Sequence, residues 1–336
     1  MLSSAASNLL DPAVLFFVLG TAIGLLRSNL EIPPAIAKFL TLYLLMALGL
    51  KGGAALAAGG LPAEGVLAIG AAMVMATLVP AYGFFILSRR INPFDSAAVA
   101  ATYGSISAVT FITTQQFLSV KGIDFGGYMT VAMVLMETPA ILMAVILATA
   151  VRARQAVLHS SSEHDDDEVF KPLSVREVLQ EALTDGAQLL LIGSLIIGYL
   201  SGTDGKTEML PFTSGIFKGM LAFFLLEMGL LVGKQISEGQ AKIDKELFVF
   251  AFLSPPINAS IALVAAYVIG LNVGDAVLLA VLSSSASYIV VPAVVRYAIP
   301  EARPGVYFTM ALGLTFPFNI LVGIPLYYGV ARYFWS

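Results

Sequence analysis

The chain has 336 residues, of which 58% are hydrophobic and 12% charged, with a net charge of −4 and no cysteine. Soluble domains carry about 25% charged residues, so this much apolar surface indicates that a lipid bilayer is the solvent. The lack of cysteine excludes disulfides, thiolate metal sites and cysteine nucleophiles. Nothing in the small net charge indicates nucleic-acid binding.

Ten apolar segments are long enough to cross a bilayer, which takes about 20 residues each. They lie at 12–30, 33–57, 65–88, 95–119, 126–151, 183–202, 211–234, 246–270, 274–297 and 304–334. We therefore expect an all-α integral membrane protein in which residues 1–151 and 183–336 each contribute five spans. The first apolar segment is expected to be a retained span, because no basic region of a cleavable signal precedes it.

A polar, acidic linker at 152–182 separates the two halves. His159 and His164 lie near Asp165–Asp167 in this linker. Histidine beside aspartate can bind metal, but the composition is more typical of a solvated connector. We expect no metal site and no cofactor there.

The two halves resemble each other in sequence. Residues 36–53 match residues 216–233 at a spacing of 180, and residues 128–133 match 307–312 at a spacing of 179. Five spans is an odd number, so the second half must enter the membrane from the opposite side. This pattern predicts an inverted repeat, which is typical of secondary transporters.

The basic residues indicate the orientation. The loops after spans 1, 3, 5, 7 and 9 hold thirteen of the eighteen Lys and Arg residues, and the other side holds Lys51, Lys121, Lys206, Lys218 and Arg332. The positive-inside rule places the larger group in the cytoplasm. Both termini are then expected outside, and the linker at 152–182 inside.

Hydroxyl residues cluster at matching places in spans 4 and 9. Such clusters suit helices that break at mid-membrane and cross there, where free N–H groups can bind an anion and carbonyl groups a sodium ion. Close packing of small residues is the simpler alternative. The predicted substrate-binding residues are Gly104, Ser105, Ile106, Ser107, Ser284, Ser285, Ala286 and Ser287. The predicted ion-binding residues are Thr110, Glu137, Ser283 and Asn319.

Four acidic residues in or beside the spans invite interpretation. Glu137 precedes Pro139 and is a candidate for sodium binding or proton sensing, although a glutamate bonded to a neighbouring helix is equally consistent. Glu227 has Ala47 at its matching position and is interpreted as structural. Asp95 and Asp275 are expected to be helix N-caps, because each lies where a helix should begin.

The chain resembles the sodium-dependent bicarbonate transporter family known best from cyanobacteria. The resemblance is strongest at Asp95–Thr114, Met136–Ala140, Ser283–Ser285 and Ile299–Leu326. It implies a 5+5 inverted fold, a core with two crossed broken helices, a gate of spans 1, 2, 6 and 7, and a homotrimer in a bacterial inner membrane. Cyanobacterial members also bind a trimeric PII-like regulator from the cytoplasm, which nothing in this sequence reports.

One position departs from that family. The cyanobacterial members carry an acidic residue directly after the serine run of span 9, and this chain has Ala286 there. It therefore looks more like the broader permease branch, and the sodium stoichiometry stays open.

The sequence thus predicts a sodium-coupled bicarbonate symporter that works by alternating access, with sodium as coupling ion and no enzymatic activity. Three alternatives remain: a symporter of another small monoanion or carboxylate, a sodium/proton antiporter, and a membrane scaffold or sensor. The antiporter usually needs acidic residues at the crossing, where this chain has Ala286. A scaffold would have no need of paired helix breaks.

Overall fold

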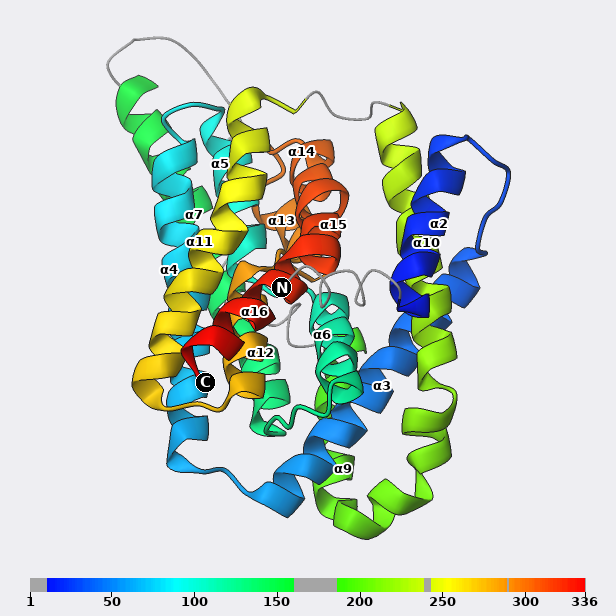
Figure 1. Ribbon diagram of the computed structural model, residues 1–336. Coiled ribbons are helices and arrows are strands. Elements are labelled where there is room, and N and C mark those ends of the chain that lie inside the picture. Colours follow the sequence, from blue (N-terminus) through cyan, green and yellow to red (C-terminus); the bar gives the residue numbers. More distant parts are fainter. Residues whose placement is uncertain (1–10, 160–185, 239–242, 289, 336) are drawn as a thin grey trace.

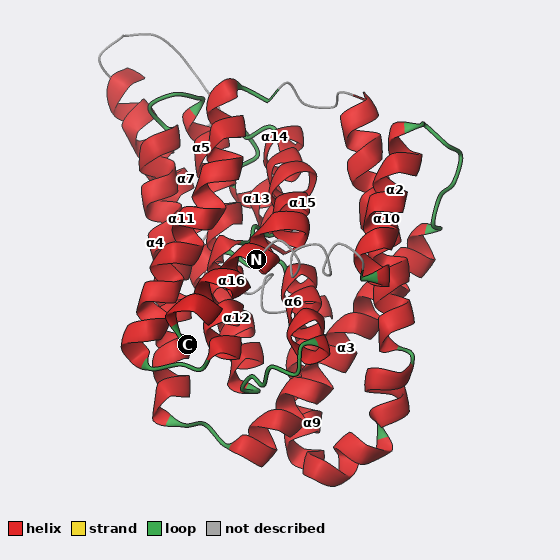
Figure 2. Cartoon of the chain, in the orientation of Figure 1, coloured by secondary structure: helices red, strands yellow, loops and turns green. Residues whose placement is uncertain are grey.

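The computed structural model describes residues 11–159, 186–238, 243–288 and 290–335. Helices make up this part of the chain, and no strand occurs in it (Figure 2). His164, Asp165–Asp167 and the rest of the predicted linker after residue 159 lie outside the described residues, as does the side chain of His159.

The first half contains six helices. They are α2 (Pro12–Leu25), α3 (Pro34–Gly59), α4 (Ala63–Leu87), α5 (Pro93–Gly104), α6 (Ala108–Val120) and α7 (Tyr128–His159). Helix α7 continues past position 152, where the linker was expected to begin.

The second half is more divided. Its α-helices are α9 (Gly186–Glu208), α10 (Phe217–Glu238), α11 (Lys245–Ile269), α12 (Val273–Ser284), α13 (Val290–Ala298), α14 (Pro304–Phe308), α15 (Phe316–Phe318) and α16 (Ile324–Phe334). Three π-helical segments join some of them, η1 (Pro211–Gly215), η2 (Thr309–Thr315) and η3 (Asn319–Gly323).

Eight helical segments in the described residues are long and apolar enough to cross a membrane, so the protein is a multi-pass membrane protein. They correspond to predicted spans 2 to 8 and span 10. Helix α2 has 14 residues and α12 has 12, so the parts of spans 1 and 9 that they form are shorter. The count of ten spans therefore stays a prediction.

The helices pack in two groups. Helix α2 lies along α10, and α3 lies along α9, whereas α4, α7 and α11 gather at the opposite edge of the molecule (Figure 1). Glycines allow the close approach in both pairs. A Cβ atom at Gly53 would lie 2.0 Å from the Leu195 carbonyl oxygen, and one at the matching Gly233 would lie 2.3 Å from the Thr21 carbonyl oxygen.

Both predicted interrupted helices are confirmed. Span 4 is α5 and α6 with extended backbone at Ser105 and Ser107 between them. Span 9 is α12 and α13, and Ser285 at its break is also extended. Figure 1 shows α5 and α13 in the upper half of the molecule and α6 and α12 in the lower half, so both breaks lie between the two ends.

Asparagines, not the predicted aspartates, cap the first halves of these helices. The Asn92 side chain accepts from the Phe94 and Asp95 N–H groups, and the Asn272 side chain accepts from the Asp275 N–H group at 2.9 Å. The N-cap assignment of Asp95 and Asp275 was therefore wrong. Both lie three residues later, in the first helical turn, where the helix dipole still favours a negative charge.

The two aspartates instead tie each interrupted helix to the start of a distant helix. Asp95 is 2% exposed and accepts from the Arg303 backbone N–H and guanidinium, each at 2.8 Å. Asp275 accepts from the Gly126 N–H at 2.7 Å and from the Tyr128 hydroxyl. Hydrogen bonds to a buried aspartate thus hold α5 to the start of α14, and likewise hold α12 to the start of α7.

Candidate functional site

The two breaks bond directly to each other. The Ser287 backbone N–H donates to the Thr102 carbonyl oxygen at 2.8 Å. The Ser107 backbone N–H donates to the Ser285 hydroxyl at 3.0 Å. Extended backbone exposes polar groups that a helix would satisfy, and such groups are tolerated at membrane depth only inside protein. Each break here supplies partners for the other.

Local capping explains why helix resumes after the breaks. The Ser107 hydroxyl accepts from the Thr110 N–H at 3.2 Å, which caps the first turn of α6. The Thr110 hydroxyl also donates to Ser107 Oγ at 2.8 Å. In the second break the Ser287 hydroxyl accepts from the Val291 N–H at 3.4 Å. A serine hydroxyl thus accepts from an N–H group in the first turn of each second half-helix.

Gly104 is the last residue of α5, and no side chain fits at this position. A Cβ atom at this position would lie 2.1 Å from Pro80 Cγ and 2.9 Å from the Ala76 carbonyl oxygen. Pro80 lies inside α4, so the proline ring packs against the end of α5. The end of α5 at the first break therefore lies in tight contact with α4.

Two serine hydroxyls at the breaks have no partner among the described residues. Ser105 Oγ and Ser283 Oγ are both buried, and neither finds a hydrogen-bond partner among the described residues. An unsatisfied buried polar atom costs about 1–3 kcal/mol and calls for an explanation such as a ligand. Sequence reasoning assigned Ser105 to the substrate and Ser283 to the ion.

Asn319 has a structural partner on each side of its amide. Its Nδ2 donates to the Ser284 carbonyl oxygen at 2.9 Å, and its Oδ1 accepts from the Tyr327 hydroxyl at 3.1 Å. Ser284 is the last residue of α12, so Asn319 satisfies a carbonyl that the helix end leaves open. Ion binding by Asn319 stays a prediction.

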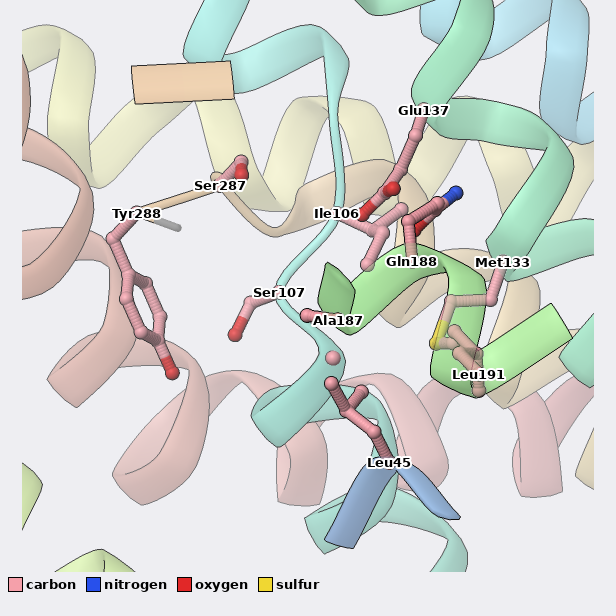
Figure 3. Close-up of a pocket in the computed structure, with 11 residues that line it drawn as sticks. Leu45, Ile106, Ser107, Met133, Glu137, Ala187, Gln188, Leu191, Ser287 and Tyr288 are labelled. Carbon is pink, nitrogen blue, oxygen red and sulfur yellow. The ribbon is translucent and has the colours of Figure 1, made fainter. Parts of the chain in front are cut away.

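A small cavity of about 30 Å³ lies beside the crossing (Figure 3). From the breaks it is lined by Ile106, Ser107, Ala108, Ser287 and Tyr288. The other lining residues are Leu45 from α3, Met133 and Glu137 from α7, and Ala187, Gln188 and Leu191 from α9. Figure 3 shows the Glu137 side chain extending from α7 toward Ile106. The cavity therefore lies where the α3–α9 pair meets the interrupted helices.

The structure brings only some of the predicted site residues to this cavity. Ile106, Ser107, Ser287 and Glu137 line it, whereas Gly104, Ser105, Ser284, Ser285 and Ala286 do not. Those five are buried at or beside the breaks, and so are Thr110 and Ser283. Sequence reasoning missed Gln188 and Tyr288. Tyr288 directly follows the serine cluster, which was a usable signal, but Gln188 is a lone polar residue on a distant helix.

A comparison with known families matches residues 12–332 to the Na+-dependent bicarbonate transporter superfamily. The chain belongs to this superfamily. The match covers nearly the whole chain and confirms the family that the sequence resembles. No curated protein matches the chain. As a member of the superfamily, the protein is a membrane transporter and not an enzyme.

The site chemistry is that of small polar groups. None of the described residues that line the cavity is a lysine or arginine, and the described part of the chain contains no group of three or more His, Cys, Asp or Glu able to hold a metal ion. Positive potential must therefore come from backbone N–H groups, from the start of α6 and from any cation that arrives with the substrate. Such a site can hold a small anion and release it again.

Proposed function

We propose that the protein is a sodium-coupled bicarbonate symporter that works by alternating access. The observation that carries the proposal is the mutual hydrogen bonding of two interrupted helices, at Ser287–Thr102 and Ser107–Ser285, beside a cavity lined by serines and Glu137. Discontinuous helices that meet in the membrane form the substrate and ion sites of many transporters.

Bicarbonate suits such a cavity because it has both donor and acceptor oxygens. The Ser107 and Ser287 groups offer hydroxyls, and Ala108 places the positive end of α6 at the cavity wall. Bringing an anion into a medium of low dielectric is costly, and a sodium ion bound close by offsets much of that cost. Ser105 and Ser283 are buried at the breaks but do not line this cavity, and we assign their unpartnered hydroxyls to substrate and sodium, respectively.

The proposed architecture is a 5+5 inverted repeat with a core and a gate. Two features support it. Span 1 packs on span 7, and in the corresponding pair span 6 packs on span 2. Gly233 of span 7 and the matching Gly53 of span 2 allow the close contact in the two pairs. Asp95 and Asp275 make corresponding connections in the two halves. The gate would be α2, α3, α9 and α10, and the other helices would form the core.

Transport then requires the gate to move. A cavity of about 30 Å³ has room for a water-sized species. It lies on the boundary between Leu45 and Leu191 of the proposed gate and Ser107 and Ser287 of the proposed core. Relative motion of the two groups would enlarge the cavity and open it to one side at a time. The homotrimer, the inner-membrane location, the cytoplasmic linker and a PII-like regulator belong to the proposal as implications of the resemblance.

Uptake of labelled bicarbonate into proteoliposomes tests the proposal. An inward sodium gradient should raise the initial rate severalfold over a potassium gradient, and equal rates would contradict symport. Ser107→Leu should abolish uptake. The matched control is Ser260→Leu, because Ser260 lies on α11 with an exposed side chain and lines neither this cavity nor the one beside Lys51.

The same vesicles separate the alternatives. A panel of unlabelled formate, acetate, nitrate and bicarbonate should compete in an order led by bicarbonate. A different leader would change the substrate but keep the mechanism. Proton release on sodium addition, with no anion uptake, would indicate an antiporter.

A further inference from the structure

A second polar cavity of about 70 Å³ lies away from the crossing. Its polar lining comes from Lys51 of α3, from Gln115, Gln116 and Ser119 of α6, and from Thr130 of α7, and Phe217 of α10 also lines it. Gln115 lies seven residues after Ala108, which places this cavity about 10 Å along α6 from the first cavity. In the predicted orientation it lies on the outer side of the breaks.

Lys51 is the most informative residue in this cavity. It lies inside the membrane-spanning helix α3, and among the described residues no carboxylate lies within salt-bridge distance of its Nζ. Its Nζ instead lies 4.1 Å from the centre of the Phe217 ring. A charged group within the membrane is costly and usually marks a substrate or ion pathway. A lysine without an acidic partner calls for an anion.

The rest of the lining can donate to such an anion. Thr130 is fully buried, and its hydroxyl has no hydrogen-bond partner among the described residues. Each of the Gln115 and Gln116 side chains offers an amide NH₂ group. A cation, an unpartnered hydroxyl and two amides around about 70 Å³ suit a small oxyanion.

The repeat shows that this charge is specific to one side. The position that matches Lys51 in the second half is Leu231, which is apolar. A lysine needed only for packing between gate helices would have a comparable long side chain in both halves. At this register position the positive charge therefore occurs in the first half alone.

We propose that Lys51, Thr130 and the two glutamines form an outer binding site that captures a small monoanion before it reaches the crossing. The site rests on the proposed function for its direction of use, but the binding itself is independent of sodium coupling. Lys51 supplies the attraction, and the neutral donors hold the anion loosely enough for it to move on along α6.

Transport kinetics give the first test. Lys51→Met keeps the length of the side chain and removes the charge, so the KM for external bicarbonate should rise about tenfold while the rate at saturation stays near wild type. Lys51→Arg should recover most of the affinity. The matched control is Lys121→Met, which removes one positive charge at the end of α6 from a residue that does not line the cavity. An unchanged KM in Lys51→Met would overturn the proposal.

Chemical labelling gives a readout that needs no transport. Lys51 in the wild-type protein in lipid vesicles is modified with an amine-reactive acylating reagent and quantified by mass spectrometry. Added bicarbonate or nitrate should slow modification of Lys51 at least threefold and leave Lys121 unaffected. Equal modification with and without anion would overturn the outer site. A wild-type protein that shows protection but no bicarbonate uptake would contradict the proposed function alone.

Discussion

The two interrupted helices occupy matching positions in the two halves, but their breaks are held differently. The Thr102 carbonyl in the first accepts directly from the Ser287 N–H. The matching carbonyl in the second interrupted helix is that of Leu282. No described residue of the first interrupted helix bonds to it directly. The Ser285 hydroxyl instead connects the two, because it donates to the Leu282 carbonyl at 3.1 Å and accepts from the Ser107 N–H. The crossing is therefore held by one direct backbone–backbone hydrogen bond and by one connection through a serine hydroxyl.

The difference leaves one serine free. Ser285 uses its hydroxyl to join the two breaks, whereas the matching Ser105 has a buried hydroxyl without a partner among the described residues. Sequence matching alone would give both serines one role. The structure indicates that Ser285 holds the crossing together and that Ser105 is available to a ligand.

The ends of the first half-helices give the largest contrast. Gly104→Ala should lower the unfolding free energy by about 3 kcal/mol, because its Cβ would collide with Pro80 and overpack a tight contact. Ser284 holds the matching place in α12, and Ser284→Ala should cost less than 1 kcal/mol. Denaturant titration in lipid micelles measures both. Equal costs would show that the two helix ends are packed alike.

Ser285→Ala should be the next most costly change. It leaves the Ser107 N–H and the Leu282 carbonyl buried without their shared partner, at about 2 kcal/mol. Ser285→Thr keeps the hydroxyl and serves as the control for its loss. Wild-type stability in Ser285→Ala would show that the hydroxyl is not the connection between the breaks.

Ser105→Ala should separate function from stability. Its hydroxyl has no partner to lose, and its removal relieves the cost of an unsatisfied buried group, so the thermal midpoint should not fall below that of wild type. Loss of one ligand contact should nevertheless lower kcat/KM for bicarbonate about tenfold, which corresponds to about 1.4 kcal/mol. Uptake assays and thermal unfolding on one preparation provide both values. Normal uptake would remove Ser105 from the site.

The aspartate anchors offer the smallest contrast. Tyr128→Phe removes one hydrogen bond to Asp275 and should cost about 1 kcal/mol at any salt concentration. Arg303→Met removes an ion pair to Asp95 in which the arginine is 61% exposed, so part of its cost should disappear at 1 M salt. Stability measured at low and high salt distinguishes the two. Matching salt dependence would mean that the anchors are chemically alike.

The sequence was sufficient to predict the breaks because their cause is local. Serine and glycine clusters at 104–107 and 283–287 lower the propensity for helix at the positions where α5 and α12 end. The helix starts were misassigned, although Asn92 before Pro93 is a typical N-cap followed by proline in the first turn. The sequence therefore contained the correct N-cap signal, but the prediction placed the N-cap at Asp95.

The cavity could not be predicted from local pattern. Leu45, Met133 and Leu191 line it, but each looks like any other apolar residue of a membrane span. The use of Asn319 to satisfy the Ser284 carbonyl depends on how two segments 35 residues apart pack. Such contacts arise from tertiary structure, so the sequence gives the polar groups of a site and not their partners.

The most direct test of the account is a cryo-electron microscopy map of the protein in lipid with sodium and bicarbonate, compared with a map in which potassium and gluconate replace them. We expect added density in the cavity lined by Ser107, Ser287 and Glu137. Density for the anion elsewhere, with this cavity unchanged between the two maps, would contradict the claim that the crossed breaks form the transport site.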